Sequence, residues 1–312
     1  MMLAFSSIAC LLSNSWLMVW IFLEINTLSF CSLIKETKKT MKLTFPETAM
    51  KYFIIQSIPS SFLLMMTFLM KEIPQKEMIM TLALVPLIIK MAASPFHEWF
   101  ISMTKKLKWD KSLLLMTWQK LAPIYLILFF KKVTIMLFAI MSLVIGATLQ
   151  MNKKLMMEIM AISSVFNISW MMMGIITSLK VFFLFTLLYW LSVFFSLKFI
   201  SNFKQQMPKE PESSKEKLMV ISIMANLAGI PPLLGFLGKW IMFSEFLKLS
   251  LSSLTTLILI FSAINFYVYL RMISSFMSKK SNPKMKSNKV SSNNLMLMFF
   301  LMNSVPILML II

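Results

Sequence analysis

Long apolar runs separated by short polar stretches dominate the sequence. A helix that spans the hydrocarbon core of a bilayer needs about 20 mostly apolar residues. By that measure the chain contains eleven hydrophobic segments, at residues 1–13, 16–34, 49–70, 78–97, 113–130, 133–150, 159–177, 179–200, 218–247, 251–277 and 294–312. The first segment is too short to span a bilayer comfortably. The pattern predicts an all-α fold, a polytopic transmembrane helix bundle of about 11 segments.

Composition supports a membrane protein. Of the 312 residues, 58% are hydrophobic and only 14% are charged, whereas soluble domains are roughly 45–50% apolar and roughly 25% charged. So few charged side chains cannot cover the surface of a soluble protein of this size. Water-soluble enzymes and nucleic-acid-binding proteins are therefore disfavoured, although the formal net charge of +19 would otherwise suggest a nucleic-acid partner.

The basic residues are distributed unevenly between the two sets of loops. If the chain crosses the membrane at every segment, nineteen of the 31 Lys and Arg residues lie in loops on one side and six on the other. Because basic loops stay inside, this predicts an inside N-terminus and an outside C-terminus. Lys51, Lys198 and Arg271 lie within about two turns of inside segment ends, where long side chains reach the lipid headgroups.

Four charged residues lie deep inside apolar segments: Glu24, Lys90, Lys120 and Lys239. A lysine that faces lipid at a helix centre costs roughly 2.5–3.5 kcal/mol, so we expect the three lysines to face the bundle interior. Burial disfavours the charged ammonium form, which lets a lysine take up and release a proton during a conformational cycle. We expect Glu24 to pair with Lys90. For each residue taken singly, a structural role remains the alternative.

Two segments, 78–97 and 218–247, combine an embedded lysine with internal prolines. Proline opens a helix and frees backbone groups, and broken helices in mid-membrane are typical of ion pathways. Each of these segments is the fourth in a set of five, and because five is odd, the two sets have opposite orientations. The sequence predicts two inverted five-helix repeats with discontinuous fourth helices. The repeats span residues 1–130 and 133–277 and are followed by a C-terminal transmembrane helix at 294–312.

Metal and nucleotide chemistry has little support in the sequence. Two cysteines and one histidine cannot supply the ligands of an iron–sulfur cluster, a zinc site or a bis-histidine haem. The five glycines form no nucleotide-binding motif. We expect no cofactor, no metal and no redox centre in this chain. His97 is expected to form hydrogen bonds at a helix end rather than to relay protons, and Glu158 and Glu245 are expected at the interface.

Residue usage suggests where the gene resides. Met occurs 33 times and Phe 28 times, and almost every basic residue is Lys, as AT-rich codons favour. Such a methionine content also follows if the codon AUA is translated as Met, as in many animal mitochondria. The sequence therefore favours an organelle-encoded gene, with an AT-rich bacterial genome as the alternative.

Several motifs resemble those of the mitochondrial NADH-ubiquinone oxidoreductase chain 2 family, the antiporter-like membrane subunits of respiratory complex I. The combination is specific and runs through most of the chain. It comprises Ser15-Trp-Leu-Met-Val-Trp20 with Glu24, Lys51-Tyr-Phe-Ile-Ile-Gln-Ser57, Lys90 with Ser94-Pro-Phe-His-Glu-Trp99, Thr117-Trp-Gln-Lys-Leu-Ala-Pro123, and Ile230-Pro-Pro-Leu-Leu-Gly-Phe236 with Lys239-Trp240.

The resemblance implies a function and a location. In that family, the residues at Glu24, Lys90, Lys120 and Lys239 form a polar axis for proton translocation, driven by electron transfer to ubiquinone in other subunits. The implied partners are other membrane-arm subunits of complex I and the lipid bilayer of the mitochondrial inner membrane, with the N-terminus on the matrix side and the C-terminus on the intermembrane-space side.

The sequence departs from the family pattern in segment 159–177 and at its inside end, where Asn167 and Glu158 replace an expected histidine and an expected basic residue. The short N-terminal segment implies a truncated first helix. Two other functions remain open: a self-contained cation/proton antiporter and a purely structural membrane-arm subunit.

Overall fold

The computed structural model describes residues 1–35, 47–72, 76–201, 214–231, 233–250 and 252–278. Within these ranges the chain forms thirteen α-helices and one 3-10 helix, without a β-strand. The predicted all-α class is therefore confirmed for the described part of the chain. The predicted last segment, 294–312, lies outside the described residues.

The chain divides into two compact units. Unit 1 comprises residues 1–145 and 164–176, and unit 2 comprises residues 146–163 and 177–312. The helices that lie in unit 1 are α1 (Met2–Leu12), α2 (Trp16–Lys35), α3 (Glu47–Glu72), α4 (Lys76–Met91), α5 (Glu98–Lys106), α6 (Trp109–Met116), η1 (Trp118–Lys120) and α7 (Leu121–Ile127). Two helices, α8 (Lys132–Met151) and α9 (Met156–Thr177), contribute residues to both units.

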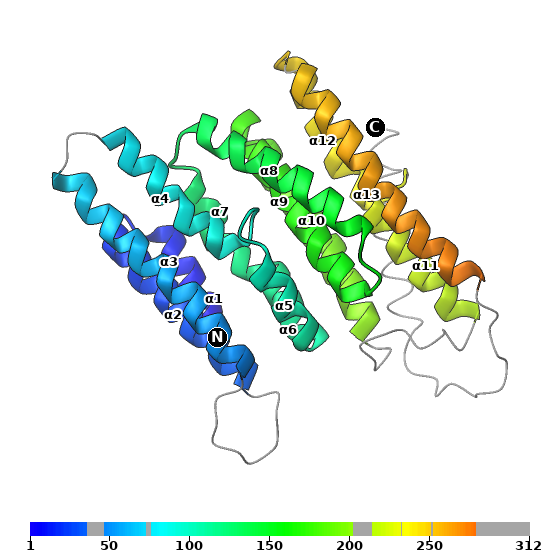
Figure 1. Ribbon diagram of the computed structural model, residues 1–312, viewed down its shortest axis with the longest axis horizontal. Coiled ribbons are helices and arrows are strands. Elements are labelled where there is room, and N and C mark those ends of the chain that lie inside the picture. The colour runs from blue at the N-terminus through cyan, green and yellow to red at the C-terminus, as the bar shows by residue number, and fades with distance from the viewer. Residues whose placement is uncertain (36–46, 73–75, 202–213, 232, 251, 279–312) are drawn as a thin grey trace. The chain divides into compact units, whose positions relative to one another are not determined.

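In unit 1 the first four helices pack as successive neighbours, α1 on α2, α2 on α3 and α3 on α4 (Figure 1). Helix α3 also contacts α5, and α7 packs against α1 and α4. Fully buried side chains such as Phe30, Leu84 and Ile127 form the core between these helices. Helix α3 thus contacts both α2 and α4, and α7 contacts both α1 and α4.

Unit 2 contains α10 (Leu179–Ser201), α11 (Ser214–Ala228), α12 (Leu234–Lys248) and α13 (Ser252–Ser278). Helix α11 packs mainly against α13, and α10 packs mainly against α12 (Figure 1). Helices α11 and α12 follow each other closely and also contact each other. The helical structure is interrupted between Ala228 and Leu234, and this interruption is the feature of unit 2 that positions the candidate site.

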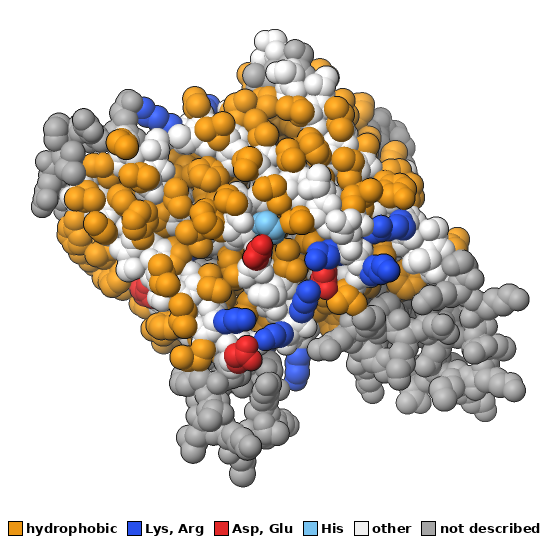
Figure 2. All heavy atoms as spheres, viewed as in Figure 1, with side chains coloured by type: hydrophobic (Ala, Val, Ile, Leu, Met, Phe, Trp, Pro, Cys, Tyr) orange, Lys and Arg blue, Asp and Glu red, His pale blue; other side chains and the backbone are white. Residues whose placement is uncertain are grey.

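Six helices of the described part are long and apolar enough to cross a membrane: α2, α3, α8, α9, α10 and α13. Many large apolar side chains on them point outward, and the face drawn in Figure 2 is mostly apolar. The chain is thus a polytopic helical membrane protein. The other predicted segments within the described ranges correspond to the short helix α1, to α4, after which residues 92–97 are not helical, and to two interrupted pairs, α6–α7 and α11–α12.

Serine and threonine side chains satisfy their own hydrogen-bonding groups within these helices. Ser6 donates to the Leu3 carbonyl at 3.0 Å, and Ser142 donates to the Ala139 carbonyl at 2.9 Å. Such bonds to a carbonyl one turn back leave no unpaired hydroxyl in an apolar environment. The many hydroxyl residues of this apolar sequence are therefore compatible with membrane burial.

The interruption of each predicted fourth segment lies beside its lysine. Helix α4 ends one residue after Lys90, where Ala92 has a φ of 61°. Helix α11 ends at Ala228, and Gly229 follows with a φ of 82°. Pro95 and Pro231 come shortly after these ends, and because proline lacks an amide proton, neither can continue a helical hydrogen-bond ladder.

A third interruption was not predicted. Between α6 and α7 the chain tightens into the 3-10 helix η1, which ends at Lys120. Pro123 follows three residues later and has no amide proton to donate to the carbonyl of Gln119, four residues back. This local distortion explains why Lys120 lies at a junction between two short helices.

Candidate functional site

Lys90 lies in the last turn of α4 and is only 5% exposed, so the prediction that it faces the interior is confirmed. Its ammonium nitrogen Nζ has no hydrogen-bond partner among the described residues. Glu24 and Cys10 both lie within electrostatic range of it. The structure therefore brings Glu24 and Lys90 near each other without a direct hydrogen bond between them.

Helix α3 connects the neighbourhoods of these two charged residues. Ser60 donates a hydrogen bond from its hydroxyl to Glu24 Oε1. Gln56, one turn earlier on α3, donates from Nε2 to the backbone carbonyl of Lys90 at 3.5 Å. Thr27 adds a weaker donor to Glu24 Oε2 at 3.4 Å. The carboxylate is thus held by hydroxyl groups, and α3 ties α2 to the end of α4.

Lys120 is 2% exposed at the junction between η1 and α7. Its Nζ donates to the backbone carbonyl of Ser164 at 3.3 Å and lies 4.8 Å from the centroid of the Phe100 ring. A neutral carbonyl and an aromatic face both attract an ammonium group, but neither carries a net charge. The prediction that Lys120 faces the interior is therefore confirmed.

A buried chain of hydrogen bonds passes through the residue next to Lys120. Gln119 donates from Nε2 to Asn26 Oδ1 at 3.1 Å and accepts from the Tyr52 hydroxyl at 3.2 Å. Asn26 lies two residues from Glu24 on α2, and Tyr52 lies one turn before Gln56 on α3. Polar side chains therefore extend from the Glu24 region to the backbone beside Lys120. We did not anticipate this chain, although glutamine, asparagine and tyrosine inside apolar runs could have indicated it.

In unit 2, Lys239 is partly exposed and bonds to the end of the preceding helix. Its Nζ donates to the carbonyl of Ala228 at 3.0 Å. Helix α11 ends in a Schellman motif, in which Gly229 N bonds to the Asn226 carbonyl at 3.1 Å and Ile230 N bonds to the Ala225 carbonyl at 3.2 Å. The ammonium group thus caps the C-terminus of α11, where a positive charge is favourable.

Asn226 caps the helix on the other side of the same break. Its side chain, buried to 2% exposure, accepts a hydrogen bond at Oδ1 from Gly235 N at 2.9 Å. Leu233 occupies the N-cap position of α12 and makes no side-chain cap, so Asn226 supplies the cap from α11. A Cβ on Gly235 would lie 1.9 Å from the Asn226 carbonyl oxygen, which explains the glycine at this close approach.

His97 takes the helix-end role that was predicted. It occupies the N-cap position of α5, and its Nδ1 lies 3.0 Å from the Pro95 carbonyl oxygen. Because a carbonyl can only accept, Nδ1 carries the proton in this hydrogen bond. The predicted hydrogen-bonding role at a helix end is therefore confirmed.

Two charged residues near segment ends differ from expectation. Glu158 lies in the first turn of α9 but is buried, and its Oε2 pairs with Lys153 Nζ at 3.7 Å. Arg271 donates to the carbonyls of Met151 at 2.7 Å and Lys153 at 3.0 Å. The arginine therefore binds carbonyls at and just after the end of α8, a contact that the sequence pattern does not predict. Glu245 bonds to Lys248 at 2.7 Å near the end of α12.

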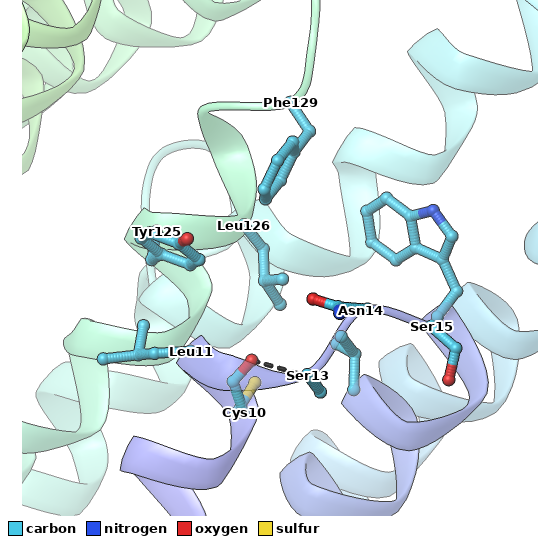
Figure 3. A pocket seen from close by; sticks show the side chains of 10 residues that line it. Cys10, Leu11, Ser13, Asn14, Ser15, Tyr125, Leu126 and Phe129 are labelled. Atoms are coloured by element: carbon cyan, nitrogen blue, oxygen red, sulfur yellow. Dashed lines mark hydrogen bonds between the residues drawn. The ribbon is translucent and has the colours of Figure 1, made fainter.

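A pocket of about 250 Å³ opens at the turn between α1 and α2 (Figure 3). Ser13 and Asn14 contribute polar groups to its lining, and Phe129, beyond the end of α7, contributes an aromatic ring. Cys10 lines it and lies within electrostatic range of Lys90. None of the four predicted charged residues lines this pocket. No group of three or more potential metal ligands occurs in the described part of the chain.

Comparison with known proteins identifies the family of this chain. The family described as NADH:quinone oxidoreductase/Mrp antiporter, transmembrane, matches residues 13–266. NADH-ubiquinone oxidoreductase chain 2 of Anopheles gambiae is 32% identical over 316 residues, which cover 96% of this chain and 92% of the relative. The chain belongs to the NADH-ubiquinone oxidoreductase chain 2 family. The Aedes aegypti member of this family is 33% identical over 325 residues, covering 100% and 94% of the two chains.

Solved structures share the fold of this chain 2 relative. A chain of respiratory complex I from Thermus thermophilus aligns with a TM-score of 0.79 at 20% identity, covering 98% of this chain and 76% of that chain. A chain of the archaeal membrane-bound sulfane sulfur reductase aligns with a TM-score of 0.83 at 14% identity, covering 98% and 71%. At such low identities the likeness concerns the fold alone.

Proposed function

We propose that this chain is a proton-translocating, antiporter-like subunit in the membrane arm of respiratory complex I, NADH:ubiquinone oxidoreductase. It moves protons through Glu24, Lys90, Lys120 and Lys239, while other subunits carry out the electron transfer. The observation that carries the proposal is the state of Lys90, a buried lysine whose ammonium group has no hydrogen-bond partner among the described residues. Membership of the chain 2 family supports the assignment to complex I.

The partners of the other two lysines suit a proton relay. Lys120 donates to the Ser164 carbonyl and Lys239 to the Ala228 carbonyl, both neutral acceptors. A neutral amine still has N–H groups, so each lysine can lose a proton and keep its hydrogen bond. A carboxylate partner would instead become an uncompensated buried charge when the lysine was deprotonated. Both protonation states are therefore compatible with the same local structure.

The finer topology is also part of the proposal. Two inverted repeats, residues 1–130 and 133–277, each have a discontinuous fourth helix, and a C-terminal transmembrane helix follows at 294–312. The interruptions after Lys90 and before Lys239 support this repeat arrangement. The chain lies in the mitochondrial inner membrane with its N-terminus on the matrix side and contacts other membrane-arm subunits.

Contacts within each unit support the alternation of crossings. Lys106 Nζ lies 3.2 Å from Glu47 Oε1, and both residues fall on the predicted matrix side of unit 1. Lys132 donates to the Ile176 carbonyl at 3.0 Å, with both at the opposite end. In unit 2, Arg271 binds the Met151 carbonyl, again joining two predicted matrix-side ends. A missed or added crossing between the partners would have separated each of these pairs.

The decisive experiment compares electron transfer with proton pumping in assembled complex that carries Lys90→Ala or Lys239→Ala. We expect NADH to be oxidised with fewer protons pumped per electron. Lys51→Ala is the matched control, because the Lys51 side chain is 54% exposed and should leave pumping unchanged. Full pumping stoichiometry in both variants would contradict the proposal.

Two further measurements separate the alternative functions. Reconstitution of the purified chain alone in vesicles should give no cation/proton exchange, whereas autonomous exchange would indicate a self-contained antiporter. If the chain were purely structural, neutralising Glu24 and Lys120 would reduce the amount of assembled complex without a specific loss of pumping. Co-migration with NADH dehydrogenase activity in a native gel of mildly solubilised membranes would establish subunit membership.

A further inference from the structure

Unit 2 contains a second buried polar cluster, away from the Lys239 break in the sequence. Gln150 lies near the end of α8, Ser163 lies on α9, and Asn265 and Tyr269 lie one turn apart on α13. Gln150 is 0% exposed, and Asn265 and Tyr269 are 1% exposed. The side chains of Ser163 and Gln150 both interact with the Tyr269 hydroxyl, and Asn265 lies one turn before Tyr269 on the same face of α13.

Three polar atoms in this cluster lack a protein partner of normal geometry. By hydrogen-bond geometry, Gln150 Nε2, Gln150 Oε1 and Asn265 Oδ1 have no partner among the described residues, although the Gln150 side chain lies close enough to the Tyr269 hydroxyl to interact with it. Each buried polar atom left unpaired costs roughly 1–3 kcal/mol, which an apolar side chain of the same shape would avoid. Buried polar groups are normally paired with protein or with ordered water, and a buried water typically makes about three hydrogen bonds.

The cluster adjoins a charged end of unit 2. Arg271, two residues after Tyr269, binds the carbonyls of Met151 and Lys153, and so fixes α13 against the end of α8. The Lys153 side chain is 35% exposed and pairs with the Glu158 carboxylate, which is 7% exposed. An ion pair that solvent can reach therefore lies at the same end of α8 as Gln150.

We propose that Gln150, Asn265 and Tyr269 form a buried water site, through which protons pass between the Lys153–Glu158 end of unit 2 and the interior of that unit. Water in this site accepts a proton on one side and releases a different proton on the other, so that one proton moves and no bond other than O–H is made or broken. The transport role rests on the proposed function, whereas the hydration of the cluster does not.

The first test is a high-resolution density map of the intact complex. Ordered water is expected within hydrogen-bond distance of the Gln150 amide and Asn265 Oδ1. A cluster without water density, with the two side chains packed only against protein, would overturn the proposal. Because this measurement involves no turnover, it stands even if the Lys90→Ala and Lys239→Ala variants pump normally and the proposed function fails.

The second test uses Gln150→Leu and Asn265→Leu, which replace the amides by apolar side chains of similar volume. We expect retained NADH oxidation with fewer protons pumped per electron in both leucine variants, and normal pumping in Gln150→Glu, which keeps a side-chain oxygen that can bind water. Asn152→Leu, at an exposed position near the same helix end, is the matched control. Unchanged pumping in both leucine variants would contradict the transport role. If the two leucine variants fail to assemble, proton pumping by Tyr269→Phe and the density map test the proposal in their place.

Discussion

The side chain of Lys239 and the carbonyl of Ala228 are joined by a hydrogen bond of 3.0 Å across the break between α11 and α12. The lysine therefore belongs to one half of the interrupted segment and is anchored on the other half. Any shift of α12 along α11 changes the distance between these two atoms. A hydrogen bond thus links Lys239 to the opposite side of the helix break.

Gly235→Ala tests how closely the two halves must approach. The added Cβ would lie 1.9 Å from the backbone oxygen of Asn226, a contact that only backbone movement can relieve. We expect a clear loss of assembled complex, measured by native gel and by thermal inactivation of the detergent-solubilised enzyme. Overpacking of this kind typically costs roughly 1–3 kcal/mol or more.

Gly238→Ala is the matched comparison on the same helix. Its Cβ would meet the side chain of Phe185 at 3.1 Å, and an aromatic ring can give way by a few tenths of an ångström. A markedly smaller effect on assembly is therefore expected. If both variants lowered the amount of assembled complex equally, the loss of a glycine from α12, rather than the close approach to Asn226, would explain the effect.

Asn226→Ala should weaken the same junction without adding atoms. The variant removes the acceptor for Gly235 N and leaves α12 without a side-chain cap, at a cost of roughly 0.5–2 kcal/mol. Asn226→Asp keeps an oxygen at the capping position, and an acid at a helix N-terminus is favourable. Thermal inactivation of the complex should therefore occur at lower temperature in Asn226→Ala and near the wild-type temperature in Asn226→Asp.

The breaks beside Lys90 and Lys239 could be predicted because proline and glycine act through local backbone chemistry. The 3-10 turn at Lys120 has a comparable signal in Pro123, but an isolated proline in the first turn of a helix is usually tolerated. That signal alone does not distinguish a helix start from a distortion within one segment. Tertiary packing of α6, η1 and α7 decides the outcome.

The partners of the charged residues could not be predicted, because they depend on which helices become neighbours. Glu24 is expected to pair with Lys90, which lies within electrostatic range of it, but Ser60 is the residue that donates a hydrogen bond to its carboxylate. Arg271 binds two carbonyls more than a hundred residues earlier in the sequence. No periodicity in an apolar segment indicates such contacts, since these helices carry apolar side chains on nearly every face.

Ser60→Ala tests the support of Glu24. The variant removes the hydroxyl that donates to Oε1 and leaves the weaker Thr27 contact, and hydrogen bonds to charged groups contribute roughly 1.5–3 kcal/mol. We expect lower pumping per electron at unchanged assembly. Ser61→Ala is the control, because the Ser61 hydroxyl is exposed and donates only to the Ile58 carbonyl. A pumping defect of the same size in the control would exclude a specific role for Ser60.

The variant Lys120→Met distinguishes a proton-relay role of Lys120 from a purely structural role. Methionine fills a similar volume without a charge, and replacing a buried charge by an apolar side chain is often neutral or stabilising. The Ser164 carbonyl loses its hydrogen bond to the Lys120 ammonium group. Because this carbonyl carries no net charge, the substitution leaves no unpaired charge behind. A relay role therefore predicts normal or greater thermal stability, with the proton-transfer step slowed by roughly 10²-fold or more. Lower stability with full pumping per electron would instead assign Lys120 to packing, because only a structural contact loses stability without slowing proton movement.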